Sequence, residues 1–441
     1  MATFYAPAEI PVRYLPRSST ANMIVGALFV VGLGAFVLRL GQDSASAWTS
    51  YVANWLFFTS IAIGGMLHAV ATWIVKAKWN WSTRRVSQSF SAFLPISFVL
   101  LLPMLSLGGD YFPWVAMMET DAIVQKKAAW LNMPFLVTRQ LVLVGLLFGL
   151  ALYFVYHALR PDMGLSQEAA GGDAARSGWR ERLTQGWMGQ EQEEVNSYKR
   201  MTTIAPVFVL VYAVAMTVIV YDWVMSLEPH WYSTMMGPWF FMGALWGGTA
   251  ATALWSVYLR TKDKDIEHGI GLQQRWDLGK LCFGLTVFWT YLFFGQYIVI
   301  WYGKLPWEQA WIIRRSGETW GAYSALVIVL CFVVPFAGLM GRKSKMKPAL
   351  LATFTSVILL GLWLERYGMV APSLHHEGDP IFTIWHPLIG LMFLGLYIGA
   401  VRWFLSTFPA MQVWQPMVDP ETVEAEMTSP QSSGRGARQT A

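Results

Sequence analysis

Charge is scarce in this sequence. Only 13% of the 441 residues are Asp, Glu, Lys or Arg, which is about half the share of an average soluble domain. Hydrophobic residues make up 55% and gather in repeated runs of about 20 residues. This combination excludes an ordinary soluble domain and indicates an all-α integral membrane protein. A transmembrane β-barrel would instead show alternating segments of about ten residues.

Cysteine is scarcer still. The only two, Cys282 and Cys331, lie within apolar segments, where a thiol is typically an inert packing residue. Two cysteines are too few to hold an iron–sulfur cluster, and no C-x-x-C-H haem-attachment motif occurs. A bis-histidine haem needs paired histidines at matching depth, but only His68 lies securely within a span, and His157 closes another. We therefore expect neither a redox cofactor nor a metal site in this chain.

Ten apolar segments are long enough to span a membrane. They cover approximately residues 21–40, 52–75, 88–107, 134–158, 201–226, 236–259, 278–301, 320–340, 348–370 and 384–405. Prolines inside or beside them, at Pro95, Pro103, Pro206 and Pro335, predict kinks or helix starts that neighbouring helices can accommodate.

The distribution of basic residues predicts the orientation. With the N-terminus inside, the outer loops hold only Lys126, Lys127, Lys304, Arg314 and Arg315, whereas the inner segments hold most of the other Lys and Arg residues. The positive-inside rule then places both termini in the cytoplasm. We expect a cytoplasmic tail over residues 1–20, a transmembrane domain over 21–405, and a partly disordered cytoplasmic tail over 406–441. Residues 160–200 are expected to form a cytoplasmic loop with one short amphipathic helix near "SGWRERLTQGWM".

The stretch "YDWVMSLEPHWYS", residues 221–233, places ionisable groups near the outer end of the fifth span. Asp222 is expected about a turn below the interface, with Glu228 and His230 in the short outer turn that follows. A charged carboxylate at mid-bilayer costs about 2–3 kcal/mol on insertion scales, so Asp222 should face the helix bundle or a wet cavity. The alternative is an interfacial carboxylate that is hydrated or caps a neighbouring helix.

Further polar residues belong to the same predicted outer layer. They are Arg139 in "MPFLVTRQL", Gln296, Tyr297 and Tyr302 at the end of the seventh span, Glu365 and Arg366 in the ninth, and His375, His376 and His386 around the last outer loop. Because adjacent residues on a helix point in different directions, we expect Glu365 and Arg366 to find partners on other helices and not to pair directly. Such a layer can bind a quinone headgroup or pass protons. Otherwise it is a polar rim that positions helices and docks an external partner.

The inner half of the predicted bundle is poorer in polar groups. Its candidates for a cytoplasmic proton half-path are His68 and Lys280. Hydroxyl and amide side chains that could line such a path are Thr72, Ser87, Gln88, Ser89 and Ser91. A single histidine on an apolar helix is more often a hydrogen-bonded structural residue, and hydroxyls also serve in helix packing.

Two stretches carry a resemblance to a known family. "YDWVMSLEPHWYS" and "DLGKLCFGLTVFWTYLFFGQYIVIWYGKLPWE" closely resemble the NrfD/polysulfide-reductase-like membrane subunits, most of all the ActF-type subunit of alternative complex III, a quinol:cytochrome c (or high-potential iron–sulfur protein) oxidoreductase. The resemblance implies a bacterial inner-membrane protein with two four-helix bundles, spans two to five and six to nine, flanked by spans one and ten. It also implies partners: a related quinol-binding membrane subunit, an extrinsic iron–sulfur protein and c-type cytochrome subunits.

The leading hypothesis is an integral subunit of a respiratory quinol oxidoreductase that has no activity alone. It would contribute proton half-paths or a quinone-related site, while partners supply haem c and iron–sulfur clusters. The proton-path candidates are Asp222, Glu228, His230, Glu365, His68, Lys280 and Tyr297, and the charge-tuning candidates are Arg139, Arg366 and again Lys280. A purely structural scaffold is the alternative. A secondary transporter fits less well, because transporters place polar groups at the midplane, whereas here they collect towards the two ends.

Overall fold

The computed structural model describes residues 10–109, 111–166, 173–376 and 378–415. The described residues form helices and contain no strand. Nine of the described helices are long and apolar enough to cross a membrane. These findings confirm the prediction of an all-α, multi-pass membrane protein.

The nine membrane-crossing helices follow the predicted segments in order. They are α1 (Ser19–Gln42), α2 (Ser44–Ile74), the run of α3 (Arg84–Ser89), η1 (Phe90–Phe93) and α4 (Leu94–Met104), α7 (Met133–Leu165), α9 (Gln190–Trp223) with η3 (Met225–Leu227), α12 (Leu272–Gly303), the run of α14 (Gly321–Ile328), η4 (Val329–Val333) and α15 (Val334–Met340), α17 (Pro348–Leu374) and α18 (Trp385–Thr407). The remaining predicted segment, 236–259, forms α10 (Met236–Leu259), which is not among the nine.

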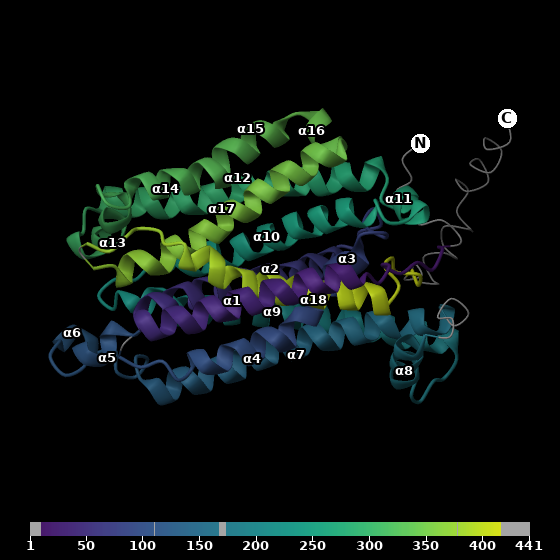
Figure 1. Cartoon of the computed structure of the whole chain (residues 1–441), viewed down its shortest axis with the longest axis horizontal. Helices are drawn as coiled ribbons and strands as arrows, with labels where there is room; N and C mark the ends of the chain where they lie inside the picture. The colour runs from purple at the N-terminus through teal and green to yellow at the C-terminus, as the bar shows by residue number, and fades with distance from the viewer. Residues whose placement is uncertain (1–9, 110, 167–172, 377, 416–441) are drawn as a thin grey trace, which may run out of the picture.

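Short helices mark the two ends of the molecule (Figure 1). We call one the α13 end, because it carries α5 (Pro113–Met117), α6 (Ala122–Gln125) and α13 (Pro306–Ser316). We call the other the α8 end, because it carries α8 (Ala174–Leu183), α11 (Lys264–Gly269) and α16 (Arg342–Met346). The long helices run between these ends.

Helix α10 occupies the centre of the molecule and packs against α2, α9, α12 and α17. Its approach to α2 is very close: a Cβ atom built on Gly248 would overlap the backbone of Gly64 and Gly65. Only glycine allows two helix backbones to come this near. The small residues of α10 therefore let it lie close to its neighbours at the centre of the molecule.

The other helices surround this core in three groups. On one side α2, α4, α7 and α9 pack together, and on the other α12, α14, α15 and α17 do so. Helices α1 and α18 pair along their length and lie against α2 (Figure 1). The ends of the described chain also meet, because the amide of Leu15 donates to the carbonyl of Leu405 (2.8 Å) and the amide of Ala410 to that of Arg13 (2.7 Å).

The region expected to be a long loop, 160–200, is mostly helical. Helix α7 continues to Leu165 and α9 already begins at Gln190, while the predicted amphipathic helix is present as α8. Hydropathy falls where the charged residues begin, so it predicts that the helices end there. In the structure these charges pair with one another: Arg160 Nε lies 2.5 Å from a Glu193 carboxylate oxygen, and both side chains are buried. The pair allows both helices to continue past the apolar segments. Of the partly disordered tail predicted over 406–441, residues 416–441 lie outside the described residues, whereas Phe408, Met411 and Trp414 are buried against the helices.

Candidate functional site

Asp222 lies in the last turn of α9 and is completely buried. Arg139 of α7 binds it with two parallel hydrogen bonds, from Nε to Oδ2 (2.7 Å) and from Nη2 to Oδ1 (2.6 Å). The neighbouring Gln140 donates a third from its amide (2.6 Å). This two-pronged arrangement is the strongest form of a charge-assisted hydrogen bond. The prediction that Asp222 faces the helix bundle is confirmed.

The Arg139 guanidinium is itself held on its other sides. It donates to the carbonyl of Trp130 (2.7 Å), and its carbon lies 4.1 Å from the centre of the Trp130 ring and 4.7 Å from that of Phe135. Hydrogen-bond donors therefore hold both oxygens of Asp222 in place, and Arg139 supplies the opposite charge. The geometry therefore fits a residue that joins α7 to α9 better than one that exchanges protons freely.

Glu365 and Arg366 form a second buried pair. Arg366 Nη1 lies 2.7 Å from Glu365 Oε2, so the expectation that these neighbours do not pair is wrong. Their Cβ atoms diverge, but the long arginine side chain reaches back around the helix. Each residue also has a partner on another helix: Trp289 of α12 donates its indole N–H to Glu365 (3.1 Å), and Arg366 donates to the carbonyl of Phe240 in α10 (3.2 Å).

Glu228 takes part in a third cluster, which joins α13 to α17. Its carboxylate accepts hydrogen bonds from Arg315 (3.0 Å) and from the hydroxyl of Ser373 (2.6 Å). Arg315 also donates from Nε to the carbonyl of Gly368 (3.1 Å). That carbonyl has no intrahelical donor, because the residue four positions on is Pro372, which lacks an N–H. Arg315 thus satisfies a helix carbonyl that proline leaves free.

The charge state of Arg315 follows from its surroundings. Burial lowers the pKa of this guanidinium to about 10, the nearby Glu228 opposes the shift, and the neighbouring Arg314 adds to it. The side chain remains protonated at neutral pH, so the Glu228 cluster contains a true ion pair.

His230 belongs to the surface and not to these buried clusters. Its Nε2 lies 2.6 Å from Asp121, and its side chain is 45% exposed. Asp121 also caps α6 by accepting from the amides of Ile123 (2.8 Å) and Val124 (3.2 Å). Partial desolvation raises the pKa of Asp121, but the hydrogen bonds from these amides and from His230 outweigh it and hold that pKa below its usual value.

A pocket of about 540 Å³ lies between α12, α13, α14 and α17 and reaches Glu365. Most of its wall is aromatic or aliphatic. Gln296 also lines it and is only 5% exposed, and its buried amide oxygen has no hydrogen-bond partner within the described structure. The indole N–H groups of Trp239 and Trp311, which line it too, are likewise buried without an acceptor. Tyr297, predicted as a proton-path residue, stands at its rim and is 38% exposed.

The wall of this pocket contains an irregular helical turn. The α14–α15 helix is interrupted by η4, a π-helical turn over Val329–Val333. Ile328 and Phe332, which lie beside and within this turn, line the pocket. Such turns are costly and occur often at functional sites. The pocket thus combines an apolar wall, a buried carboxylate and several polar groups that lack partners.

His68 is buried where α2 meets α10. Its Nδ1 lies 3.2 Å from the hydroxyl of Thr249, and its Nε2 has no hydrogen-bond partner in the described structure. Ser87, Gln88, Ser89 and Ser91 are buried, as predicted for a half-path lining, and Thr252 donates to Ser87 (3.3 Å). Lys280, by contrast, is 50% exposed and pairs with Asp277 three residues earlier (2.6 Å), so it does not reach the outer carboxylates.

Three buried polar contacts are not predicted from the sequence. Arg85 forms an ion pair with Asp162, and both side chains are completely buried although they lie outside the predicted spans. Arg160 pairs with Glu193 in the same way. Asn54 of α2 lies 3.4 Å from the ring of His386 and accepts the indole N–H of Trp363 (2.8 Å). No local pattern marks these residues, since each partner is far away in the chain.

The described residues contain no group of three or more His, Cys, Asp or Glu side chains that could hold a metal ion. Cys282 and Cys331 are both buried and unpaired as disulfides. No model of a known protein family matches the chain, and no curated protein matches it significantly.

Proposed function

We propose that this chain is an integral membrane subunit of a respiratory quinol oxidoreductase of the alternative complex III type. It carries no redox cofactor itself and contributes a quinone-related site and parts of proton paths. The observation that supports this best is the pocket beside Glu365, in which an unpartnered amide and a buried carboxylate lie at the inner end of an apolar cavity.

The chemistry of a quinol suits this pocket. Oxidation of a quinol to a quinone releases two electrons and two protons, so a headgroup site needs hydrogen-bond partners for two ring oxygens and a nearby proton acceptor. The Gln296 amide and the Trp239 indole supply free hydrogen-bonding groups, and Glu365 supplies a carboxylate. The aromatic walls match the ring, and the exposed Tyr297 and Phe294 mark an entrance facing lipid. Electrons would pass to partner subunits that carry haem c and iron–sulfur clusters.

The proton paths would approach this layer from both sides. On the inner side, His68, Thr249 and the buried hydroxyls near Ser87 form a partial polar route from the α8 end. On the outer side, Glu228 lies nearer the surface than Glu365 and is linked to α17 through Ser373. In this scheme Arg366 tunes the charge of Glu365, whereas Asp222 and Arg139 position helices.

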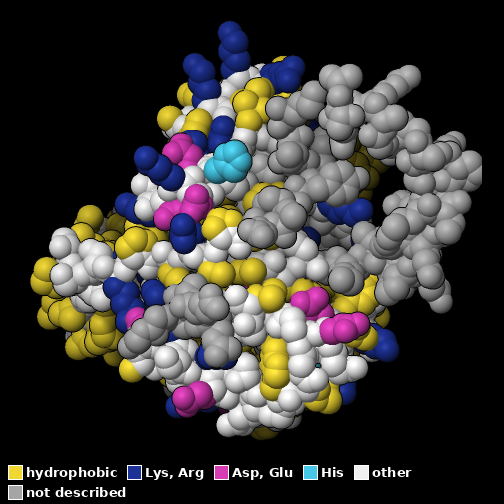
Figure 2. Space-filling model, turned by 90° about the vertical axis from the view of Figure 1, so that its right-hand side faces the viewer, with side chains coloured by type: hydrophobic (Ala, Val, Ile, Leu, Met, Phe, Trp, Pro, Cys, Tyr) yellow, Lys and Arg dark blue, Asp and Glu magenta, His cyan; other side chains and the backbone are white. Residues whose placement is uncertain are grey.

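The arrangement in the membrane is part of the proposal. We infer ten spans, with α10 as the tenth, in two four-helix bundles that α1 and α18 flank. Basic side chains lie across the face of the α8 end (Figure 2), which supports a cytoplasmic location for that end and for both termini. The membrane would be the bacterial inner membrane, with a related quinol-binding subunit, an iron–sulfur protein and c-type cytochromes as partners.

Labelling with a photoreactive quinone tests the site. In the purified assembly, a short-chain azidoquinone should label peptides of α12 and α17, and Gln296→Leu and Glu365→Gln should each reduce the labelling at least fivefold. Gln309→Leu is the matched control, because this residue of α13 carries the same amide but does not line the pocket. Labelling that is equal in all four proteins, or that falls elsewhere in the chain, would refute a quinone site here.

A structural scaffold is the second candidate, and the closed Asp222 and Glu228 clusters favour it, because every charge there already has a partner. A scaffold predicts that Glu365→Gln leaves quinol turnover and proton release per electron unchanged in the assembled complex. The proposed function predicts that assembly is retained but turnover falls. Purification without haem-bearing partners would instead favour a transporter.

A further inference from the structure

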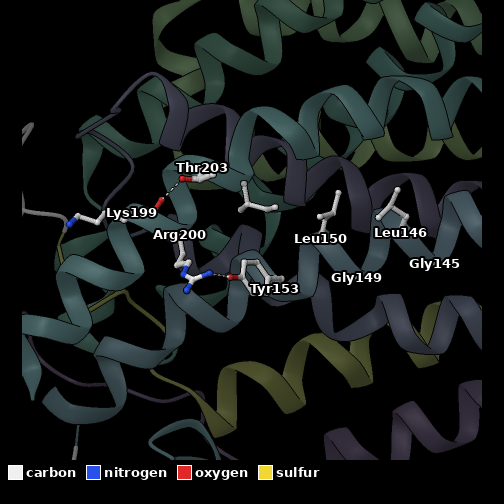
Figure 3. Close-up of a pocket in the computed structure, with 9 residues that line it drawn as sticks. Gly145, Leu146, Gly149, Leu150, Tyr153, Lys199, Arg200 and Thr203 are labelled. Carbon is white, nitrogen blue, oxygen red and sulfur yellow. Dashed lines mark hydrogen bonds between the residues drawn. The ribbon is translucent and has the colours of Figure 1, made fainter. Parts of the chain in front are cut away.

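A second cavity, far from the pocket beside Glu365, lies between α7 and α9 towards the α8 end (Figure 3). Its volume is about 750 Å³. One part of its lining is apolar and includes Gly145, Leu146, Gly149 and Leu150 of α7. The other part, on the first turns of α9, is basic. The cavity is thus a groove with two chemically different halves.

Two glycines make the apolar half. A Cβ atom built on Gly149 would meet no other atom within 4 Å, and one on Gly145 would touch only Phe98, at 3.7 Å. They therefore leave a channel on the outer surface of α7 and are not needed for contact with α9. The side chain of Leu146 beside this channel is 47% exposed, which places the groove on a surface that would face lipid.

The basic half is formed by Lys199 and Arg200, both exposed. Arg200 Nη1 donates to the hydroxyl of Tyr153 at 3.5 Å (Figure 3). Neither basic side chain pairs with a carboxylate among the residues that the structure describes. Arg200 and the phenol hydroxyl of Tyr153 thus meet at one mouth of an apolar groove, while Lys199, which points away from them, adds a second positive charge on the same turn of α9 (Figure 3).

The spacing suits a lipid. Tyr153 and Gly145 are eight residues apart on α7, which corresponds to about 12 Å along the helix. A group bound at Tyr153 and Arg200 is therefore followed by an apolar channel that runs towards the centre of the membrane. A phosphate on a hydrocarbon chain has this distribution of charge and apolar surface.

We propose that this groove binds an anionic phospholipid, with its phosphate at Arg200 and Tyr153, the charge of Lys199 nearby and an acyl chain over Gly145 and Gly149. The site does not depend on the proposed function. A transmembrane helix of another subunit could also pack on two glycines four residues apart. The unpaired positive charges favour the lipid, because a helix would need a carboxylate at this depth to match them.

Native mass spectrometry of the full-length chain tests the proposal, with phosphatidylglycerol and phosphatidylcholine added in turn. We expect phosphatidylglycerol to bind more tightly. Lys199→Gln/Arg200→Gln should weaken it about thirtyfold, since each basic residue near an anionic lipid contributes about a fivefold change in affinity. Gly149→Leu should fill the channel and weaken both lipids without a clash, because the space is open.

Two controls separate specific binding from general effects. Lys343→Gln/Lys347→Gln makes the same change of charge on exposed residues at the same end, and Gly26→Leu adds the same side chain at another open glycine on α1. Both should retain wild-type lipid affinity. Equal phosphatidylglycerol binding by the groove variants and the controls would overturn the proposal. The proposal would also be overturned if the Gly149→Leu variant, purified in the assembly, lost a neighbouring subunit but kept its lipid.

Discussion

Replacing Asp222 by Asn tests what the best-formed ion pair in the protein does. The Arg139 side chain is 5% exposed and that of Asp222 is fully buried, so the variant leaves a buried guanidinium without its counter-charge. Breaking a buried ion pair by removing one partner costs about 3–5 kcal/mol. Because Asn keeps the shape and one acceptor oxygen, we expect about 3 kcal/mol for Asp222→Asn and up to about 5 kcal/mol for Arg139→Gln.

A double-mutant cycle makes this expectation quantitative. The combined variant Asp222→Asn/Arg139→Gln removes both charges, so it should be less destabilised than the sum of the two single variants by about 2 kcal/mol or more. Unfolding of the full chain in mixed micelles with increasing SDS, followed by tryptophan fluorescence, gives the free energies of unfolding.

The same variants separate positioning from proton transfer. If Asp222 only joins α7 to α9, the assembled complex with Asp222→Asn releases the wild-type number of protons per electron despite its lower stability. Single variants that each cost under about 1 kcal/mol, or effects that are strictly additive, would refute the reasoning from burial. A reduced proton ratio in a normally assembled complex would show that Asp222 carries protons after all.

Three further predictions follow from the packing and the charges. Gly248→Ala should destabilise the chain by about 1–3 kcal/mol, because its Cβ would overlap the α2 backbone, whereas Gly26→Ala, in open space, should cost nothing in the same unfolding assay. Arg315→Met should destabilise the chain by about 3–5 kcal/mol and speed hydrogen exchange in the last turns of α17, and normal exchange there would contradict its role as a carbonyl partner. The pKa of Asp121 is lower in the folded than in the unfolded chain, so this carboxylate stabilises the α6 turn above its unfolded pKa, and the stabilisation is lost as pH falls through the folded pKa. Hydrogen exchange at the amides of Ile123 and Val124 should therefore rise in that acidic range. An Asp121→Asn variant should lose this pH dependence.

The two buried carboxylates of the outer layer differ in what they can do. Asp222 has hydrogen-bond donors on both oxygens and lies outside the pocket beside Glu365. Glu365 also has two partners, but it borders a cavity whose amide and indole groups are free. A residue that binds and releases protons needs access to a substrate or solvent. We therefore expect substitution of Glu365 to lower quinol turnover and substitution of Asp222 to lower the free energy of unfolding.

The positions of the helices could be read from the sequence. Apolar runs of about 20 residues are a local property, and a chain in lipid must satisfy its backbone hydrogen bonds within each segment. The predicted segment 236–259 coincides with α10, and 348–370 begins at the same residue as α17. The burial of Asp222 among helices could also be predicted, because a carboxylate in a membrane helix must avoid hydrocarbon.

The partners of the charged residues could not be read in this way, because they depend on which helices meet. Asp222 binds a residue 83 positions earlier, and Glu228 binds one 87 positions later. A prediction from hydropathy ends a membrane helix where charged residues begin. Arg160 and Glu193 are nevertheless helical, because the two side chains form an ion pair with each other. Which segments form apolar helices thus follows from local properties of the chain, since backbone hydrogen bonding and burial act within each segment. Which charges pair, which helix lies at the centre and where cavities remain follow from the folded arrangement, since they depend on contacts between distant segments.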